Sequence, residues 1–86
     1  MKNITFTPAA YADYIEWLRI DKKTFLKITE LIRESAKNPD NGIGKPEMLK
    51  HELSGFWSRR INKEHRLIYR VTEDSINIIS CKYHYK

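Results

Sequence analysis

The chain opens with polar and apolar positions that alternate with a period of two. Residues 3–7 place Ile4 and Phe6 on one side, which predicts a short, half-buried strand. Thr7 and Pro8 then predict the start of a helix. A threonine can cap the first backbone N–H groups, and a proline is tolerated in the first turn because its missing N–H needs no partner there.

Apolar residues next recur at helical spacing in two successive segments. The two stripes consist of Ala10, Tyr14, Trp17 and Leu18, and of Phe25, Ile28, Leu31 and Ile32. Asp21 lies between them and can cap the second helix, and the Asn, Pro and Gly residues of 38–42 end it. We therefore expect a hairpin of two helices.

The second half of the chain reads as strands. Residues 44–53 have no clean period, and Pro46 excludes a central strand, so we expect an ordered connection with at most one helical turn. Residues 56–61, 66–71 and 76–83 then predict three strands joined by polar turns, which form a β-meander.

Alternation along these strands separates an apolar face from a face with arginines. It places Arg60 and Arg66 on the polar face and Arg59 on the opposite one, unless a bulge intervenes. The helices should cover the apolar face. The expected fold is a single α+β domain over residues 1–86, with a small antiparallel sheet and two N-terminal helices packed on one face.

Composition excludes several classes of protein. The 86 residues and 10.3 kDa suit one domain, and one cysteine cannot form an internal disulfide. Cys81 is best explained as a small core residue. No Cys/His spacing resembles a zinc site, and no signal-peptide or membrane-spanning run occurs, so we expect a cytoplasmic protein without a metal or other cofactor.

The formal net charge of +5 is concentrated in the second half of the chain. Residues 44–86 hold nine basic and five acidic side chains, against seven and six in residues 1–43. A basic surface of this kind favours polyanions. The second half is therefore the candidate polyanion-binding face.

Three kinds of side chain in this half are candidates for acid–base chemistry. Glu47, between Lys45 and Lys50, could act as a general base, although a solvated loop glutamate is the commoner case. The arginines could hold a phosphate, or could belong to an ordinary solvated sheet face. His84, between two tyrosines, could donate a proton from a docked chain end, or could belong to a frayed tail.

The other two histidines are weaker candidates. His51 falls in the connection and His65 in a turn, and we expect both to be solvated. Glutamate, arginine and histidine together are the inventory of a metal-independent ribonuclease, which uses the RNA 2′-hydroxyl as nucleophile and so spares DNA. A non-catalytic basic module that binds RNA or the ribosome and blocks translation is the alternative.

Several ordered blocks resemble the YoeB/Txe toxins of bacterial type II toxin–antitoxin systems, within the RelE-like group. They are residues 44–47 (GKPE), 49–51 (LKH), 53–61 (LSGFWSRRI), 64–69 (EHRLIY) and 81–85 (CKYHY). The resemblance covers essentially the whole chain and is densest from residue 44 onward. It implies a RelE-like fold, in agreement with the pattern of elements.

The resemblance also implies a ribosome-dependent mRNA endonuclease that cleaves the message in the ribosomal A site. It assigns the general base to Glu47, the general acid to His84 and the cation on the scissile phosphate to Arg66. The assisting residues that it implies, for contacts with phosphate, rRNA or substrate, are Lys50, Arg60 and Tyr85.

Partners are likewise implied by the resemblance. It predicts inhibition by a YefM/Axe-type antitoxin, action on the 70S ribosome with its mRNA, operator DNA bound only by the toxin–antitoxin complex, and a homodimer. Members of the family generally end at the His-Tyr pair, whereas Lys86 follows Tyr85 here.

Overall fold

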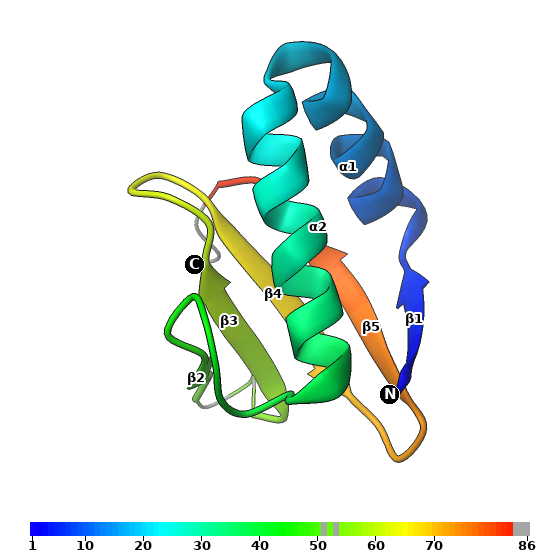
Figure 1. Ribbon diagram of the computed structural model, residues 1–86. Helices are drawn as coiled ribbons and strands as arrows, with labels where there is room; N and C mark the ends of the chain where they lie inside the picture. Colours follow the sequence, from blue (N-terminus) through cyan, green and yellow to red (C-terminus); the bar gives the residue numbers. More distant parts are fainter. Residues whose placement is uncertain (51, 53, 84–86) are drawn as a thin grey trace.

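Two helices cover one face of a five-stranded sheet in the described part of the chain (Figure 1). The computed structural model describes residues 1–50, 52 and 54–83, so the predictions for His51, His84 and Tyr85 lie outside it. The helices are α1 (Pro8–Ile20) and α2 (Lys22–Lys37). The strands are β1 (Asn3–Phe6), β2 (Glu47–Met48), β3 (Phe56–Arg60), β4 (Arg66–Val71) and β5 (Ser75–Ser80).

The sheet has the strand order β1-β5-β4-β3-β2. Strands β2 to β5 are antiparallel neighbours, which confirms the predicted meander of β3, β4 and β5. Strand β1 instead pairs in parallel with β5, so the sheet is mixed. Strand β5 ends at Ser80, earlier than predicted, and a register shift lies opposite Ile68 and Tyr69.

Both predicted helix caps are present. The Thr7 hydroxyl accepts a hydrogen bond from the Ala10 amide at 3.1 Å. Asp21 accepts hydrogen bonds from the Lys23 and Thr24 amides and from the Thr24 hydroxyl, the last at 2.7 Å. The bond from the Thr24 side chain is the main cause that lowers the pKa of Asp21, since it stabilises the charged carboxylate.

The core lies between the helices and the inner face of the sheet. Its fully buried members include Ile28, Leu31, Leu67, Tyr69, Ile76 and Ile78. Trp17 is buried as predicted, but Leu18 is 46% exposed. The prediction for Leu18 was wrong. Helix α1 packs on the core with the face that carries Trp17, and the next residue along a helix points in a different direction, so Leu18 faces outward.

Cys81 is a core residue, as predicted. Burial, with a smaller contribution from the Asp13 carboxylate, raises the pKa of its thiol to about 12. The thiol therefore stays protonated at neutral pH. Within the described residues, neither helix is long and apolar enough to cross a bilayer.

Candidate active site

Glu47 lies on an edge strand rather than in an irregular connection. It is the first residue of β2 and pairs with Ser58 of β3, and the Leu49 amide extends the contact by donating to the Phe56 carbonyl at 2.8 Å. This strand was not predicted from the sequence, because two residues are too few to show the alternation of polar and apolar positions that marks a strand. Pro46, which precedes it, is compatible with an edge position.

Arg60 and Arg66 face each other directly across β3 and β4, which confirms that they share the polar face of the sheet. Together with Glu47 they line one hollow of about 150 Å³. Its complete described lining is Lys45, Glu47, Ser58, Arg60 and Arg66. Lys50 is exposed and is not among the described residues that line the hollow.

The charge in this hollow suits an anion. Like charges directly opposite on neighbouring strands repel each other, yet no ion pair reaches Arg60 or Arg66 from any described residue. Arg66 is nevertheless fixed, because its Nη1 donates to the Asn62 and His65 carbonyls at 2.6 and 3.0 Å. A phosphate between the guanidinium groups would relieve the repulsion and accept paired hydrogen bonds.

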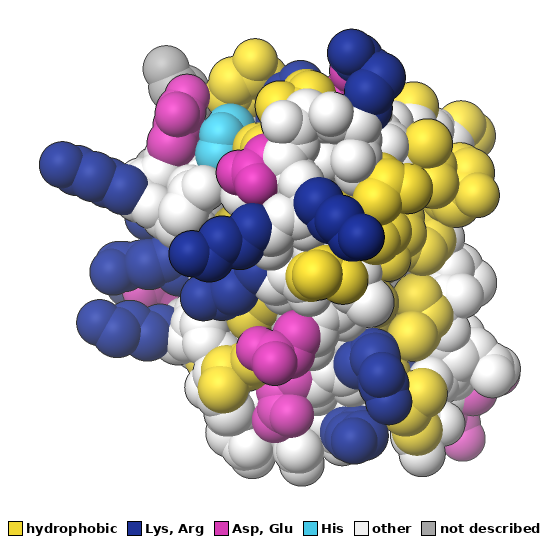
Figure 2. Space-filling view, turned by 45° about the horizontal axis from the view of Figure 1, so that its top comes forward, with side chains coloured by type: hydrophobic (Ala, Val, Ile, Leu, Met, Phe, Trp, Pro, Cys, Tyr) yellow, Lys and Arg dark blue, Asp and Glu magenta, His cyan; other side chains and the backbone are white. Residues whose placement is uncertain are grey.

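A wider basic surface adjoins this hollow. A neighbouring depression of about 430 Å³ shares Lys45 and Arg60 with it and adds Lys27 and Lys63. Figure 2 shows several Lys and Arg side chains gathered on the left of the molecule, and other basic side chains beside the apolar ones toward the right. The hollow with the carboxylate therefore borders a surface that can follow a nucleic-acid backbone.

Arg59 holds the loop that precedes the candidate base. Its side chain is fully buried on the face opposite Arg60, as alternation predicted. Nη1 donates to the Ile43 carbonyl at 2.7 Å, and Nη2 donates to the carbonyls of Asn41 and Asn38. Nε donates to the Tyr69 hydroxyl at 3.0 Å. The guanidinium thus fastens residues 38–43 to the sheet.

Gly44 connects this loop to Lys45. Its φ of 82° lies in the left-handed region, and its carbonyl accepts a hydrogen bond from the Arg60 amide at 2.6 Å. A Cβ at this position would lie 2.8 Å from Leu31 Cδ2 and 3.1 Å from Arg59 Cβ. Only glycine allows the loop to lie this close to the core.

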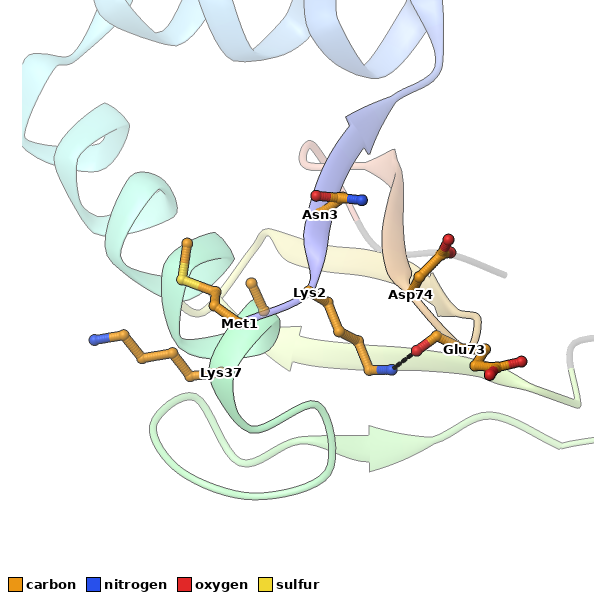
Figure 3. Close-up of a pocket in the computed structure, with 7 residues that line it drawn as sticks. Met1, Lys2, Asn3, Lys37, Glu73 and Asp74 are labelled. Atoms are coloured by element: carbon orange, nitrogen blue, oxygen red, sulfur yellow. Dashed lines mark hydrogen bonds between the residues drawn. The ribbon is translucent and has the colours of Figure 1, made fainter.

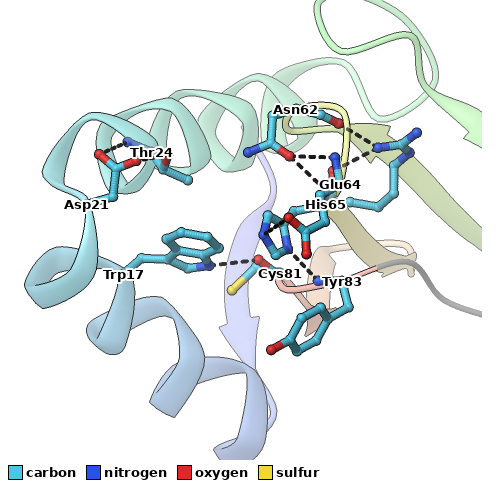
Figure 4. A network of polar contacts seen from close by, with 9 residues as sticks. Trp17, Asp21, Thr24, Asn62, Glu64, His65, Cys81 and Tyr83 are labelled. Atoms are coloured by element: carbon cyan, nitrogen blue, oxygen red, sulfur yellow. Dashed lines mark hydrogen bonds and ion pairs between the residues drawn. The ribbon is translucent and has the colours of Figure 1, made fainter.

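His65 is 7% exposed, so the expectation that it is solvated was wrong. Its Nδ1 accepts a hydrogen bond from the Tyr83 amide at 2.7 Å, and its ring meets Trp17 edge-on at a centroid distance of 4.8 Å (Figure 4). The Trp17 indole also donates to the Cys81 carbonyl at 3.0 Å. Hydrogen bonds therefore hold the chain end as far as Tyr83, and the prediction for His84 lies beyond the described residues.

A separate hollow lies at the other edge of the sheet (Figure 3). It is lined by the chain start, the end of α2 and the β4–β5 turn. The ammonium group of Lys2 donates to the Thr72 and Glu73 carbonyls at 2.8 and 2.7 Å. This lysine ties the first strand to the turn, and the hollow brings together none of the predicted catalytic residues.

The arrangement favours acid–base chemistry on a phosphate. Glu47 supplies an exposed carboxylate beside the cations of Lys45, Arg60 and Arg66. The protonated, buried thiol of Cys81 is unsuited to act as a nucleophile. Nowhere in residues 1–50, 52 and 54–83 do three His, Cys, Asp or Glu side chains group closely enough to hold a metal ion.

The two helices and the five-stranded sheet define a small α+β domain with a RelE-like fold. The backbone superposes with a TM-score of 0.72 on a chain of the toxin–antitoxin complex RelBE2 from Mycobacterium tuberculosis, over 96% of this chain and 98% of that one. At 20% identity, that similarity establishes the fold alone.

Comparison of the sequences assigns the family. Residues 6–85 match the YoeB-like toxins of bacterial type II toxin–antitoxin systems, and the chain belongs to this family. It is 51% identical to the toxin YoeB of Escherichia coli K12 over 82 residues. These residues make up 95% of this chain and 98% of that toxin. The family resemblance read from the sequence is thereby confirmed.

Two structures from Staphylococcus aureus are similar throughout. A YoeB dimer is 53% identical, with a TM-score of 0.89 over 98% of both chains. A heterotetrameric YoeB–YefM toxin–antitoxin complex is 52% identical, with a TM-score of 0.88 over 99% of both chains. Similarity of this extent includes the strands and the loop that form the basic hollow.

Proposed function

We propose that the protein is a ribosome-dependent mRNA endonuclease that cuts the message in the ribosomal A site and arrests translation. The observation that carries this proposal is the meeting of the Glu47 carboxylate with Arg60 and Arg66 in one small hollow beside a basic surface. Membership of the YoeB family supports it. Such a toxin acts in the cytoplasm, where translating ribosomes are found.

In the proposed reaction, Glu47 removes the proton from an RNA 2′-hydroxyl, and the 2′-oxygen attacks the adjacent phosphorus. Arg66 stabilises the extra negative charge on the pentacoordinate phosphorane. The bond to the 5′-oxygen then breaks as His84 donates a proton to that oxygen. The products are a 2′,3′-cyclic phosphate and a 5′-hydroxyl, and no cofactor takes part.

Three further residues have proposed supporting roles. Arg60 lies opposite Arg66 and can share the phosphate, and Lys50 is exposed on the same segment as Glu47 and can contact RNA. Tyr85 is proposed to stack on or orient the substrate.

We also propose that a YefM/Axe-type antitoxin binds and inhibits this toxin, and that only the resulting complex contacts operator DNA. The YoeB–YefM complex of the Staphylococcus aureus relative supports the first part, and the YoeB dimer from the same species supports homodimer formation by the free toxin. Co-purification with a YefM-type protein, followed by size measurement of the free toxin, tests both associations.

A cleavage assay with purified protein tests the proposed reaction. A defined mRNA is incubated with and without programmed 70S ribosomes, using the wild type, Glu47→Gln and His84→Gln, with Glu30→Gln on the exposed side of α2 as matched control. We expect cutting only on the ribosome, with wild-type rates for the control. Loss of the general base or acid should slow cleavage by about 10²- to 10⁴-fold.

The same assay separates catalysis from simple blocking of the ribosome. A basic module that only binds would inhibit translation without a cut, and Glu47→Gln would inhibit as well or better, because an anion has been removed. That pattern would contradict the endonuclease and favour the binding module.

A further inference from the structure

His65 is a buried histidine that has no part in the proposed cleavage steps. It lies in the turn between β3 and β4 and is enclosed by Trp17 from α1 and by Tyr83 from the chain end (Figure 4). Asn62 builds this turn, because its side-chain oxygen accepts hydrogen bonds from the Glu64 and His65 amides at 2.9 and 2.8 Å. The imidazole is therefore held in one place.

The hydrogen bond from Tyr83 indicates the tautomer of the neutral ring. Nδ1 accepts the Tyr83 N–H, so it carries a lone pair, and the proton of the neutral ring is on Nε2. Nε2 faces a carboxylate oxygen of Glu64 at 3.7 Å. Among the described residues, the Tyr83 ring also lies 5.4 Å from the imidazole between centroids, and the Arg66 guanidinium donates to the His65 carbonyl.

Tyr83 is held from both sides by this turn. Its N–H donates to His65 Nδ1 at 2.7 Å, and its carbonyl accepts a hydrogen bond from the Arg66 amide at 3.1 Å. Its φ of 62° lies in the left-handed region, which is unfavourable for a tyrosine and persists only where surrounding contacts impose it. The two hydrogen bonds are the contacts that impose it.

We propose that His65 is a positioning residue: its neutral imidazole fixes the backbone of Tyr83, the residue that directly precedes the proposed general acid. This inference rests on the proposed function, because it assigns a purpose to the placement of the general acid. One turn then positions both the cation for the phosphate and the start of the segment that carries the proton donor.

The arrangement makes the contact sensitive to protonation. A proton on Nδ1 would place two donors opposite each other, and the Tyr83 N–H would lose its acceptor. The fixed position of Tyr83 therefore depends on the neutral imidazole.

Backbone amide exchange measured by NMR tests the contact without reference to activity. His65→Phe keeps a flat ring against Trp17 but removes the acceptor, whereas His65→Asn keeps an acceptor near the position of Nδ1. We expect the Tyr83 amide to be protected from exchange in the wild type and in His65→Asn. In His65→Phe its protection factor should fall by at least about tenfold. Unchanged protection in a folded His65→Phe protein would overturn the contact.

A titration of the wild-type protein provides a second measurement that needs no variant. The ¹⁵N shift of His65 Nδ1 and the amide shift of Tyr83 should change together over the same pH range, once intrinsic pH effects are subtracted. Independent titration of the two signals would overturn the proposed coupling.

Ribosome-dependent cleavage then tests the positioning role. We expect His65→Phe to lower kcat by about 10- to 100-fold with little change in KM, and His65→Asn to recover most of the loss. Loss of Tyr83 protection with unchanged kcat would refute the positioning role. Failure of the wild type to cleave would instead contradict the proposed function, while the amide data would still decide whether His65 holds Tyr83.

Discussion

The loop of residues 38–46 precedes the candidate base, and the chain end at residues 81–83 accepts a hydrogen bond from the Arg66 amide, but the two segments are held in different ways. A buried guanidinium fastens the loop, because Arg59 donates to three of its carbonyls and to Tyr69. The chain end is held instead by single hydrogen bonds to separate residues: the Trp17 indole and the Arg66 amide donate to its carbonyls, and the Tyr83 amide donates to His65.

This difference predicts different consequences of disturbing each segment. Removal of Arg59 leaves several buried polar groups without partners, so the loop cannot be freed without a large loss of stability. The chain end depends on a neutral imidazole and a few neutral hydrogen bonds, each worth only about 1 kcal/mol. The segment with the candidate base is therefore part of the stable fold, and the segment before the candidate acid is more easily released.

Trp17→Ala should produce the largest loss of stability, because the indole is both packed in the core and bonded to the chain end. We expect the free energy of unfolding to fall by about 3–5 kcal/mol, as for other buried tryptophans. Urea denaturation measures it, with the exposed neighbour Leu18→Ala as the matched control. A loss below about 1 kcal/mol would mean that Trp17 contributes little to the core.

Arg59→Met should come next, with an expected loss of about 3 kcal/mol in the free energy of unfolding, since the Tyr69 hydroxyl and the loop carbonyls lose their donor. Arg70→Met, on the exposed position of the neighbouring strand, should change stability by less than about 0.5 kcal/mol. Equal effects of the two substitutions would mean that Arg59 does not hold the loop.

Gly44→Ala should cost about 1–3 kcal/mol, because it combines a left-handed backbone with a Cβ that meets Leu31 and Arg59. Thermal unfolding measures the loss, and Gly55→Ala provides a control at a left-handed glycine with no atom near its added Cβ. If Gly44→Ala is no worse than Gly55→Ala, close packing of the loop does not limit this position.

The smallest expected effect is a loss of stability at alkaline pH, caused by ionisation of the Cys81 thiol. The pKa of the Cys81 thiol is raised in the folded state from an ordinary 9.0 to about 12, so folding keeps it protonated. Its contribution is complete below pH 9 and is lost as the pH rises toward 12. Cys81→Ser should lessen the decline of the melting temperature between pH 9 and 11, and an identical decline in both proteins would contradict this account.

The sequence predicted the features that depend on local patterns. Thr7 and Asp21 mark the two helix starts because capping depends on neighbouring residues, and alternation placed Arg60 and Arg66 on one face and Arg59 on the other. These are short-range rules, and the structure confirms them.

Features that depend on distant contacts were not predicted. Strand β2 is too short to have a period, and the parallel pairing of β1 with β5 joins segments about 70 residues apart. His65 has polar neighbours in the sequence, and it is buried because Trp17 of α1 and the chain end pack against it. The roles proposed for His84 and Tyr85 stay predictions.

The most direct test of the central claim uses an mRNA with a single 2′-deoxynucleotide at the mapped cut site, presented in the A site of programmed 70S ribosomes. Cleavage through the 2′-oxygen predicts that this message stays intact, while the matched all-ribose message is cut to a 2′,3′-cyclic phosphate or its 3′-phosphate product. Cutting of the deoxy-substituted message at the same position would contradict the proposed mechanism.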